Sequence, residues 1–256
     1  MVLGANRFRP IRSRYLSPAR PGTECLTNGL NDPQIPGKDI HVQRIIGSFL
    51  IASACVVAQT VPAEQLLHRI PRSAAREYRA STSALGKGDL TQAIAHCRKA
   101  LDLDPDNAAA HDDLGILYLW GEETEKAREQ FARAIALEPR LVTSHINESL
   151  ALLALGRPGE AEASAREALR IAPAEPFAHL LLGWSLAAQN RYTDDSLIDL
   201  RFAARQYPEA YLAMADVLIH KGSLVEAKNE VEAYLASDAI ELRPMAEAWL
   251  KFLTIQ

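Results

Sequence analysis

The spacing of apolar residues between positions 108 and 139 predicts two helices joined by a short turn. The first helix places Leu114, Gly115 and Tyr118 on one face, because they stand at i, i+1 and i+4. The second helix repeats apolar residues at i, i+4 and i+7, which are Ala127, Phe131 and Ala134. Gly115 has no Cβ and therefore lets the second helix approach closely. Pro139 ends the unit, since a helix cannot easily continue through proline.

The unit recurs with a period of 34 residues, as the spacing of Pro105, Pro139 and Pro173 shows. We expect five units, at residues 74–107, 108–141, 142–175, 176–208 and 208–240. The second half of the fourth unit is displaced by one residue, which predicts an insertion in its loop at 189–195. One hairpin cannot bury both of its faces, so about three or more must stack. Residues 243–253 form an amphipathic pattern that predicts a helix capping the open end.

The unit resembles a tetratricopeptide repeat, whose pattern is W-x2-L-G-x2-Y…A-x3-F…P, with His111 in the place of the tryptophan. The resemblance extends over residues 73–253. It implies an all-α fold, an α-solenoid of about five helix-turn-helix repeats with a C-terminal capping helix. It also implies a right-handed superhelix with a concave inner surface that holds a protein or peptide partner.

The distribution of net charge along the chain makes some classes of partner less favoured than others. The 256 residues are 48 % hydrophobic and carry a net charge of −4, which is ordinary for a soluble helical protein. Residues 1–44 hold seven Lys/Arg and three Asp/Glu, a net charge of +4, so the remainder carries −8. An acidic array does not favour nucleic acid, which needs a basic surface. The arginines of residues 1–41 leave a basic arm as an alternative.

The N-terminal residues before the repeats divide into three parts. Residues 1–41 are rich in Pro, Gly and Arg, which predicts a disordered or untranslated leader. Residues 42–58 contain a 14-residue apolar run, Ile45 to Ala58, after Arg44, and they resemble a secretory signal peptide with a Val56-x-Ala58 cleavage pattern. The run is short for a membrane span. Residues 59–72 form a linker with a short helix.

The position of the apolar run leaves two interpretations open. A start at Val42 would give ordinary signal-peptide geometry, and the mature chain would begin near Gln59 in the periplasm or cell envelope of a bacterium. Alternatively, the segment is retained as a buried or anchoring helix, or is lipidated at Cys55, and holds the protein at a membrane. Cys97 replaces the phenylalanine of the first unit, so we expect a buried, unpaired thiol.

Candidate metal and catalytic residues favour structural roles. His111, His145 and His179 recur 34 residues apart, yet helices pack about 8–10 Å apart, whereas zinc needs all its ligands at about 2 Å. Asp102, Asp104 and Asp106 begin like a calcium loop but lack its glycine. We therefore expect no catalytic residue, no metal and no cofactor.

The candidate partner-binding residues occupy positions that the family resemblance directs toward the inner surface. They form a mainly apolar set with an acidic edge: Asp112, Asp113, Ile116, Trp120, Ile146, Asn147, Leu150, Trp184 and Asp216. The set predicts a groove for an amphipathic helix with basic flanks. The leading hypothesis is a non-catalytic interaction module or scaffold. The alternative is a structural subunit of a cell-envelope assembly, anchored through residues 42–58.

Overall fold

The computed structural model describes residues 70–255, and this part of the chain contains eleven α-helices and no strand. The predicted all-α repeat array is confirmed. The predictions for residues 1–69 lie outside the described residues. The helices are α3 (Arg72–Gly86), α4 (Leu90–Leu103), α5 (Ala108–Trp120), α6 (Thr124–Leu137), α7 (Val142–Ala154), α8 (Pro158–Ile171), α9 (Pro176–Ala188), α10 (Asp194–Ala203), α11 (Glu209–His220), α12 (Leu224–Ala236) and α13 (Arg243–Ile255). None of these helices is both long and apolar enough to cross a membrane.

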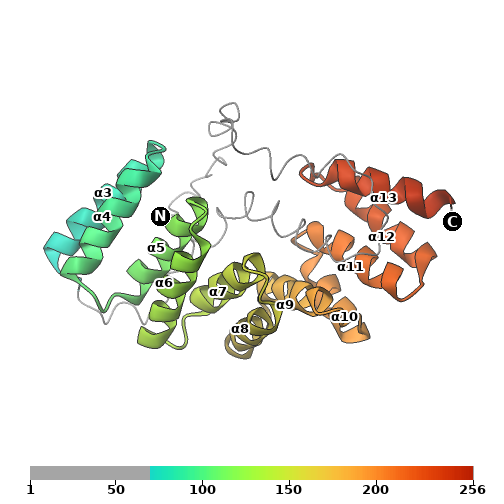
Figure 1. The fold of residues 1–256 in the computed structure, drawn as a ribbon, viewed down its shortest axis with the longest axis horizontal. Helices are drawn as coiled ribbons and strands as arrows, with labels where there is room; N and C mark the ends of the chain where they lie inside the picture. The colour runs from blue at the N-terminus through green and yellow to red at the C-terminus, as the bar shows by residue number, and fades with distance from the viewer. Residues whose placement is uncertain (1–69, 256) are drawn as a thin grey trace, which may run out of the picture. The chain divides into compact units, whose positions relative to one another are not determined.

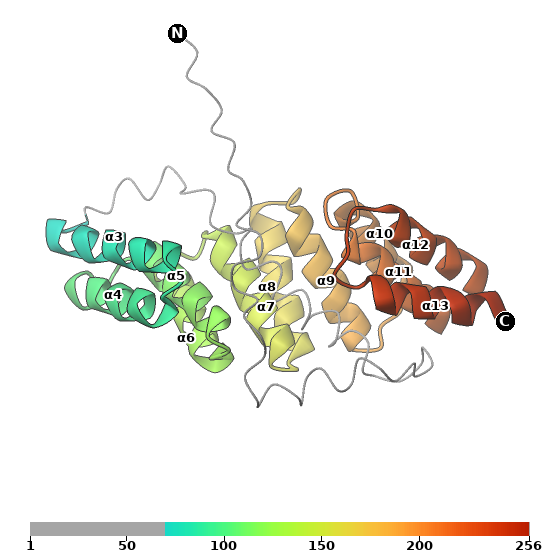
Figure 2. The ribbon, with the colours of Figure 1, turned by 90° about the horizontal axis from the view of Figure 1, so that it is seen from above.

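The helices pack as successive hairpins (Figures 1 and 2). Each first helix lies against the second helix of its own unit, in the pairs α3–α4, α5–α6, α7–α8, α9–α10 and α11–α12. Each second helix also contacts the first helix of the next unit, and α13 packs on α12. The first helices α5, α7, α9 and α11 contact one another in order, and we call them the first-helix row. No contact of this size joins α3 to α5.

Two glycines set the distance within their hairpins. A Cβ on Gly115 would lie 2.4 Å from Phe131 Cε1, and one on Gly183 would lie 2.4 Å from Leu200 Cδ2. Phe131 and Leu200 are fully buried, so neither side chain has open space into which it can retreat. The Leu-Gly positions of the repeat therefore let a large side chain of the second helix pack directly against the first helix.

A residue in the left-handed backbone conformation follows the first helix of every unit. The φ angles are 80° at Gly88, 60° at Glu122, 69° at Gly156, 57° at Asn190 and 79° at Gly222. This conformation reverses the chain after a helix and favours glycine, which has no Cβ to clash. Three units use glycine here, one uses asparagine and one uses glutamate.

The repeated histidines tie each first helix to the turn before it. Nε2 of His111, His145 and His179 donates to the carbonyl oxygen of the proline six residues earlier, at 3.0, 2.9 and 3.0 Å. The other ring nitrogen reaches the second helix in two units: Nδ1 of His111 lies 2.8 Å from Gln130 Oε1, and Nδ1 of His179 lies 2.7 Å from Asp199 Oδ1. Each ring therefore has a structural role in the packing of its unit.

The fourth unit departs from the others between its two helices. Helix α10 has 10 residues, whereas the other second helices have 13 or 14. The connection from α9 to α10, Gln189–Thr193, is longer than the corresponding Gly121–Glu123 of the second unit. Thr193 starts α10 as its N-cap and accepts a hydrogen bond from the backbone N–H of Ser196 at 3.2 Å.

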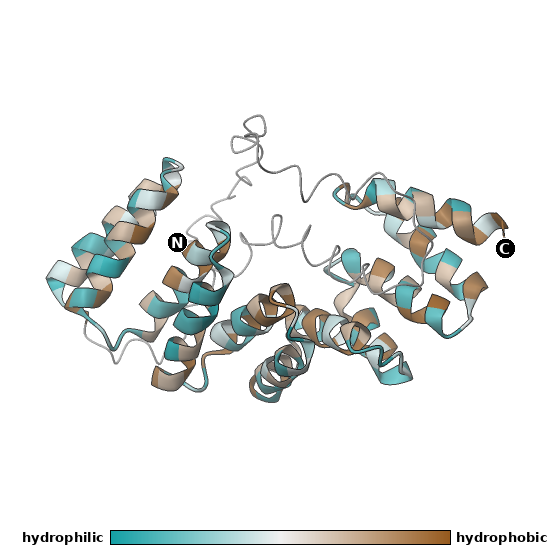
Figure 3. Ribbon diagram, in the orientation of Figure 1, coloured by the Kyte–Doolittle hydropathy of each residue, from teal (hydrophilic) through white to brown (hydrophobic). Residues whose placement is uncertain are grey.

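The buried apolar residues form two main clusters along the array. The first joins α4, α5 and α6 around Phe131 and Leu114. The second runs from Ile146 on α7 to Leu253 on α13 and includes Trp184, Tyr234 and Trp249. Hydrophobic colour is dense along α7 and α9 in Figure 3. The first helices α7, α9 and α11 also bury more residues than their partners α8, α10 and α12.

Candidate partner-binding surface

One face of α5 remains partly accessible. Ala109, Asp113, Ile116 and Trp120 stand at i, i+4, i+7 and i+11 and are half-buried, so they form a continuous strip, which we call the α5 strip. Ile116 and Trp120 pack with their inner sides against the first core cluster. Trp120 Nε1 is buried and has no hydrogen-bond partner among residues 70–255. The strip presents one carboxylate beside two large apolar side chains.

Asp112, next to the strip, is buried and joins two units. Its Oδ1 accepts a hydrogen bond from Ser144 Oγ at 2.7 Å, and Asn147 Nδ2 lies 3.2 Å from both of its carboxylate oxygens. Burial raises the pKa of Asp112 to about 6, although these hydrogen bonds act in the opposite direction. Asp112 and Asn147 therefore hold α5 to α7, a role that the sequence pattern did not reveal.

Burial also raises the pKa of Asp113 to about 6. Unlike Asp112, Asp113 is half-buried and lies on the accessible strip. Its negative charge develops as the pH rises through about 6, so any attraction to a cationic partner should strengthen over this range.

Six of the nine predicted partner-binding residues are buried in the structure. They are Asp112, Ile146, Asn147, Leu150, Trp184 and Asp216, each with at most 6 % of its surface exposed. Trp184 has no exposed surface and belongs to the second core cluster. Helices α9 and α11 are apolar around most of their circumference, and such helices bury all of their faces. Asp113, Ile116 and Trp120 are the predicted residues that retain exposed surface.

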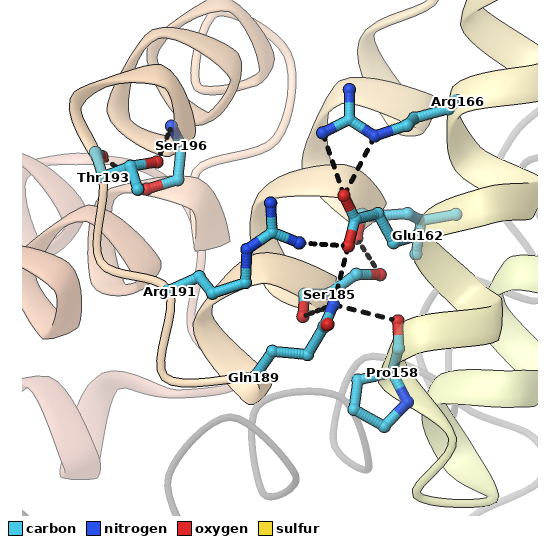
Figure 4. A network of polar contacts seen from close by, with 9 residues as sticks. Pro158, Glu162, Arg166, Ser185, Gln189, Arg191, Thr193 and Ser196 are labelled. Carbon is cyan, nitrogen blue, oxygen red and sulfur yellow. Dashed lines mark hydrogen bonds and ion pairs between the residues drawn. The ribbon is translucent and has the colours of Figure 1, made fainter.

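A polar network joins α8 to the end of α9 and to the long connection of the fourth unit (Figure 4). Glu162 accepts hydrogen bonds from Gln189 Nε2 at 2.9 Å and from Arg166 Nε at 3.0 Å, and it pairs with Arg191. Partial burial raises the pKa of Glu162, but these hydrogen bonds and the two arginine charges outweigh it, and the pKa is lowered. Gln189 Nε2 also lies 3.0 Å from the carbonyl oxygen of Ser185. The network thus fixes the connection against α8.

An open groove of about 390 Å³ lies beside this network, between α8, α9 and α10. It is lined by four apolar residues and three charged ones, which are Leu169, Leu182, Leu186, Ile198, Arg166, Asp195 and Asp199. Ile198 is 65 % exposed. The sequence reasoning missed this groove, although a signal for it existed: isoleucine stands where the second helices of other units carry polar or small residues.

Comparison with known proteins identifies the repeat. The tetratricopeptide repeat family matches residues 84–142 with one of its models and residues 146–195 with another. A curated relative, the STIP1 homolog of Dictyostelium discoideum, is 27 % identical over 135 residues, which cover 53 % of this chain and 21 % of the relative. The chain therefore corresponds to about a fifth of that protein.

Solved structures share the arrangement of helix pairs. The thermophilic TPR protein TTC0263 of Thermus thermophilus superposes with a TM-score of 0.56 at 22 % identity, over 70 % of this chain and 99 % of that one. PilW, described as a type IV pilus biogenesis factor, superposes with a TM-score of 0.60 at 21 % identity, over 73 % and 92 %. These similarities concern the fold alone. With the helix pairs, the Leu-Gly contacts and both family matches in agreement, this chain is a member of the tetratricopeptide repeat family.

Proposed function

We propose that the protein is a non-catalytic interaction module that binds a segment of a partner protein on the α5 strip. Tetratricopeptide repeats generally mediate protein–protein interaction. The observation that carries the proposal is the accessibility of Asp113, Ile116 and Trp120 on one face of α5, where the corresponding faces of α9 and α11 are buried. Large apolar side chains with remaining exposure beside a carboxylate are typical of interaction sites.

The chemistry of the strip supports an amphipathic helix or peptide as the partner segment. Its apolar side chains, spaced i, i+3 or i+4, and i+7, would cover Ile116 and Trp120. A Lys or Arg at its edge would lie near Asp113. This charge pair would increase the association rate more than the affinity. Trp120 is the residue whose truncation should weaken such a complex most, because tryptophans often dominate interfaces.

Site-specific photo-cross-linking tests this proposal in cells that make the protein. A benzophenone amino acid is placed in the full chain at Ile116, and at Ala163 on α8 as an exposed control. We expect a discrete partner adduct from position 116 that Trp120→Ala reduces, and none from position 163. Equal adducts at both positions, or an adduct at 163 alone, would rule out the α5 strip.

We also propose that the chain is exported through the signal-peptide-like segment at residues 42–58. The support is the apolar run with its Val56-x-Ala58 pattern. A structural subunit of a cell-envelope assembly, anchored through the same segment, is the alternative that the run favours. Fractionation with mass spectrometry of the native protein separates them. Export with cleavage predicts a free chain beginning near Gln59, whereas anchoring predicts a membrane-bound chain that retains the segment.

A further inference from the structure

The groove between α8, α9 and α10 has a residue composition that the other units do not share. The second helices of units two to five align on their first buried residue, which is Ala127, Ala161, Ser196 or Ala227. Two positions later each unit exposes one side chain, and these are Glu129, Ala163, Ile198 and Asn229. Only the fourth unit exposes a large apolar side chain here, and it lies in the groove.

In the third unit, a polar contact occupies the corresponding place. At the corresponding positions of the third unit, Ser164 Oγ donates to Glu148 Oε2 at 2.8 Å. In the fourth unit the corresponding residues are Asp199 and Leu182. Asp199 Oδ1 lies 2.7 Å from His179 Nδ1 instead. The polar contact is replaced by an apolar floor that continues to Ile198, Leu186 and Leu169.

The charges at the edge of the groove leave one carboxylate unpaired. Arg166 pairs with Glu162, Asp199 with His179, and the neighbouring Asp194 with Lys221. Asp195 lines the groove, is exposed, and makes no ion pair with the described residues. An apolar floor with one free negative charge at its rim is complementary to an apolar side chain that has a cation close to it in sequence.

Hydrogen bonds and ion pairs connect the elements around the groove. Arg166 belongs both to its rim and to the Glu162 network, and Gln189 and Arg191 of the same network secure the long connection before α10 (Figure 4). The short α10 starts directly after this connection. A site on restrained helices loses little entropy when a ligand binds.

We propose that this groove is a second docking site, separate from the α5 strip, for a short protein segment that carries a leucine-like or aromatic side chain next to Lys or Arg. The apolar side chain packs on Leu182, Leu186 and Ile198, and the cation pairs with Asp195. The site does not depend on the proposed function of the α5 strip, because no residue of α5 lines it.

A phage library of random peptides, selected on the full chain, provides the test. The peptides enriched on the unaltered protein should share an apolar residue followed closely by Lys or Arg. Ile198→Glu should weaken their binding about tenfold or more, because it removes the apolar floor and adds a charge. Asp195→Asn should weaken binding less and should reduce its dependence on salt. Glutamate is the residue that the second unit has at this position, so the fold should accept it.

Two control variants locate the binding. Val225→Glu changes another exposed aliphatic residue, 77 % exposed and outside the groove, and should leave peptide binding unchanged. Trp120→Ala on the α5 strip should also leave it unchanged. The proposal fails if Ile198→Glu binds the peptides normally, if Trp120→Ala abolishes their binding, or if they lack basic residues. It also fails if sedimentation shows that the unaltered chain self-associates and Ile198→Glu does not, because the occupant is then a second copy.

Discussion

Helices α5 and α9 are equivalent first helices of the second and fourth units, yet corresponding positions on the two helices differ in burial. Both carry a Leu-Gly pair whose glycine receives a large side chain from the second helix. The α5 strip has Asp113 and Ile116 half-buried, whereas α9 places Leu181 and Trp184 at the corresponding positions and buries both completely. Motif residues therefore build the hairpin, and the exposure of the residues between them differs from one unit to another.

The largest expected difference between the two regions concerns their tryptophans. Trp184→Ala removes a fully buried side chain and should destabilise the protein by about 3–5 kcal/mol. Trp120→Ala removes a half-buried side chain and should shift stability by less than half as much, while it weakens partner capture. Urea unfolding followed by far-UV circular dichroism measures both. Equal shifts would contradict the distinction between α5 and α9.

The second prediction concerns pH and the contact between α5 and α7. The folded chain holds the proton of Asp112 up to about pH 6, whereas the unfolded chain releases it near its ordinary pKa of 3.8. Stability from this group is therefore lost as the pH rises from about 4 to 6, by at most about 3 kcal/mol. Asp112→Asn should flatten the stability profile over this range, as urea midpoints at several pH values would show.

Asp106→Asn, on an exposed turn, is the matched control for this measurement and should leave the profile unchanged. Asp113 acts in the same direction, so the double variant with Asp113→Asn should be flatter still. An unchanged slope in both variants would show that burial of these carboxylates does not govern the pH response.

The third prediction tests whether the two regions share their hairpin packing. Gly115→Ala and Gly183→Ala each place a Cβ at 2.4 Å from a buried side chain and should each destabilise by about 1–3 kcal/mol. Gly121→Ala is the control, because its nearest neighbour would be a carbonyl oxygen at 3.5 Å, an ordinary contact. Thermal unfolding of the three variants gives the comparison. A normal melting temperature for Gly115→Ala would contradict the close approach.

The smallest expected effect lies in the turn after α5. Glu122 has a φ of 60°, where three other units have glycine, so Glu122→Gly should relieve strain and stabilise the protein by at most about 1 kcal/mol. Asn190→Gly should gain less, since asparagine tolerates this conformation better than glutamate does. A lower melting temperature for Glu122→Gly would show that the Glu122 side chain stabilises the fold by more than its left-handed backbone conformation destabilises it.

The sequence predicted the fold well because each hairpin depends on a few local residues. Gly115, Phe131 and Pro139 stand at spacings that only paired helices satisfy, and the long connection of the fourth unit follows from the displaced Ser196 and Leu200. The candidate site was predicted in part. Periodicity identifies the face that meets the partner helix, but it does not show how far the opposite face is covered. It therefore did not predict the burial of Trp184 and Asp216, and Ile198 was overlooked.

The sequence-local packing of the array has a consequence for how the protein gains and loses structure. Within the part of the chain that the structure describes, all substantial contacts join helices that are adjacent or next but one in sequence. Few residues must therefore be brought together across a long loop, and folding can begin at more than one hairpin and spread to its neighbours. The core cluster around Phe131 contains fewer buried residues than the second cluster, so we expect native-state hydrogen exchange to reveal opening of this end of the array first. A partner bound to the α5 strip would therefore stabilise the part of the molecule that opens first.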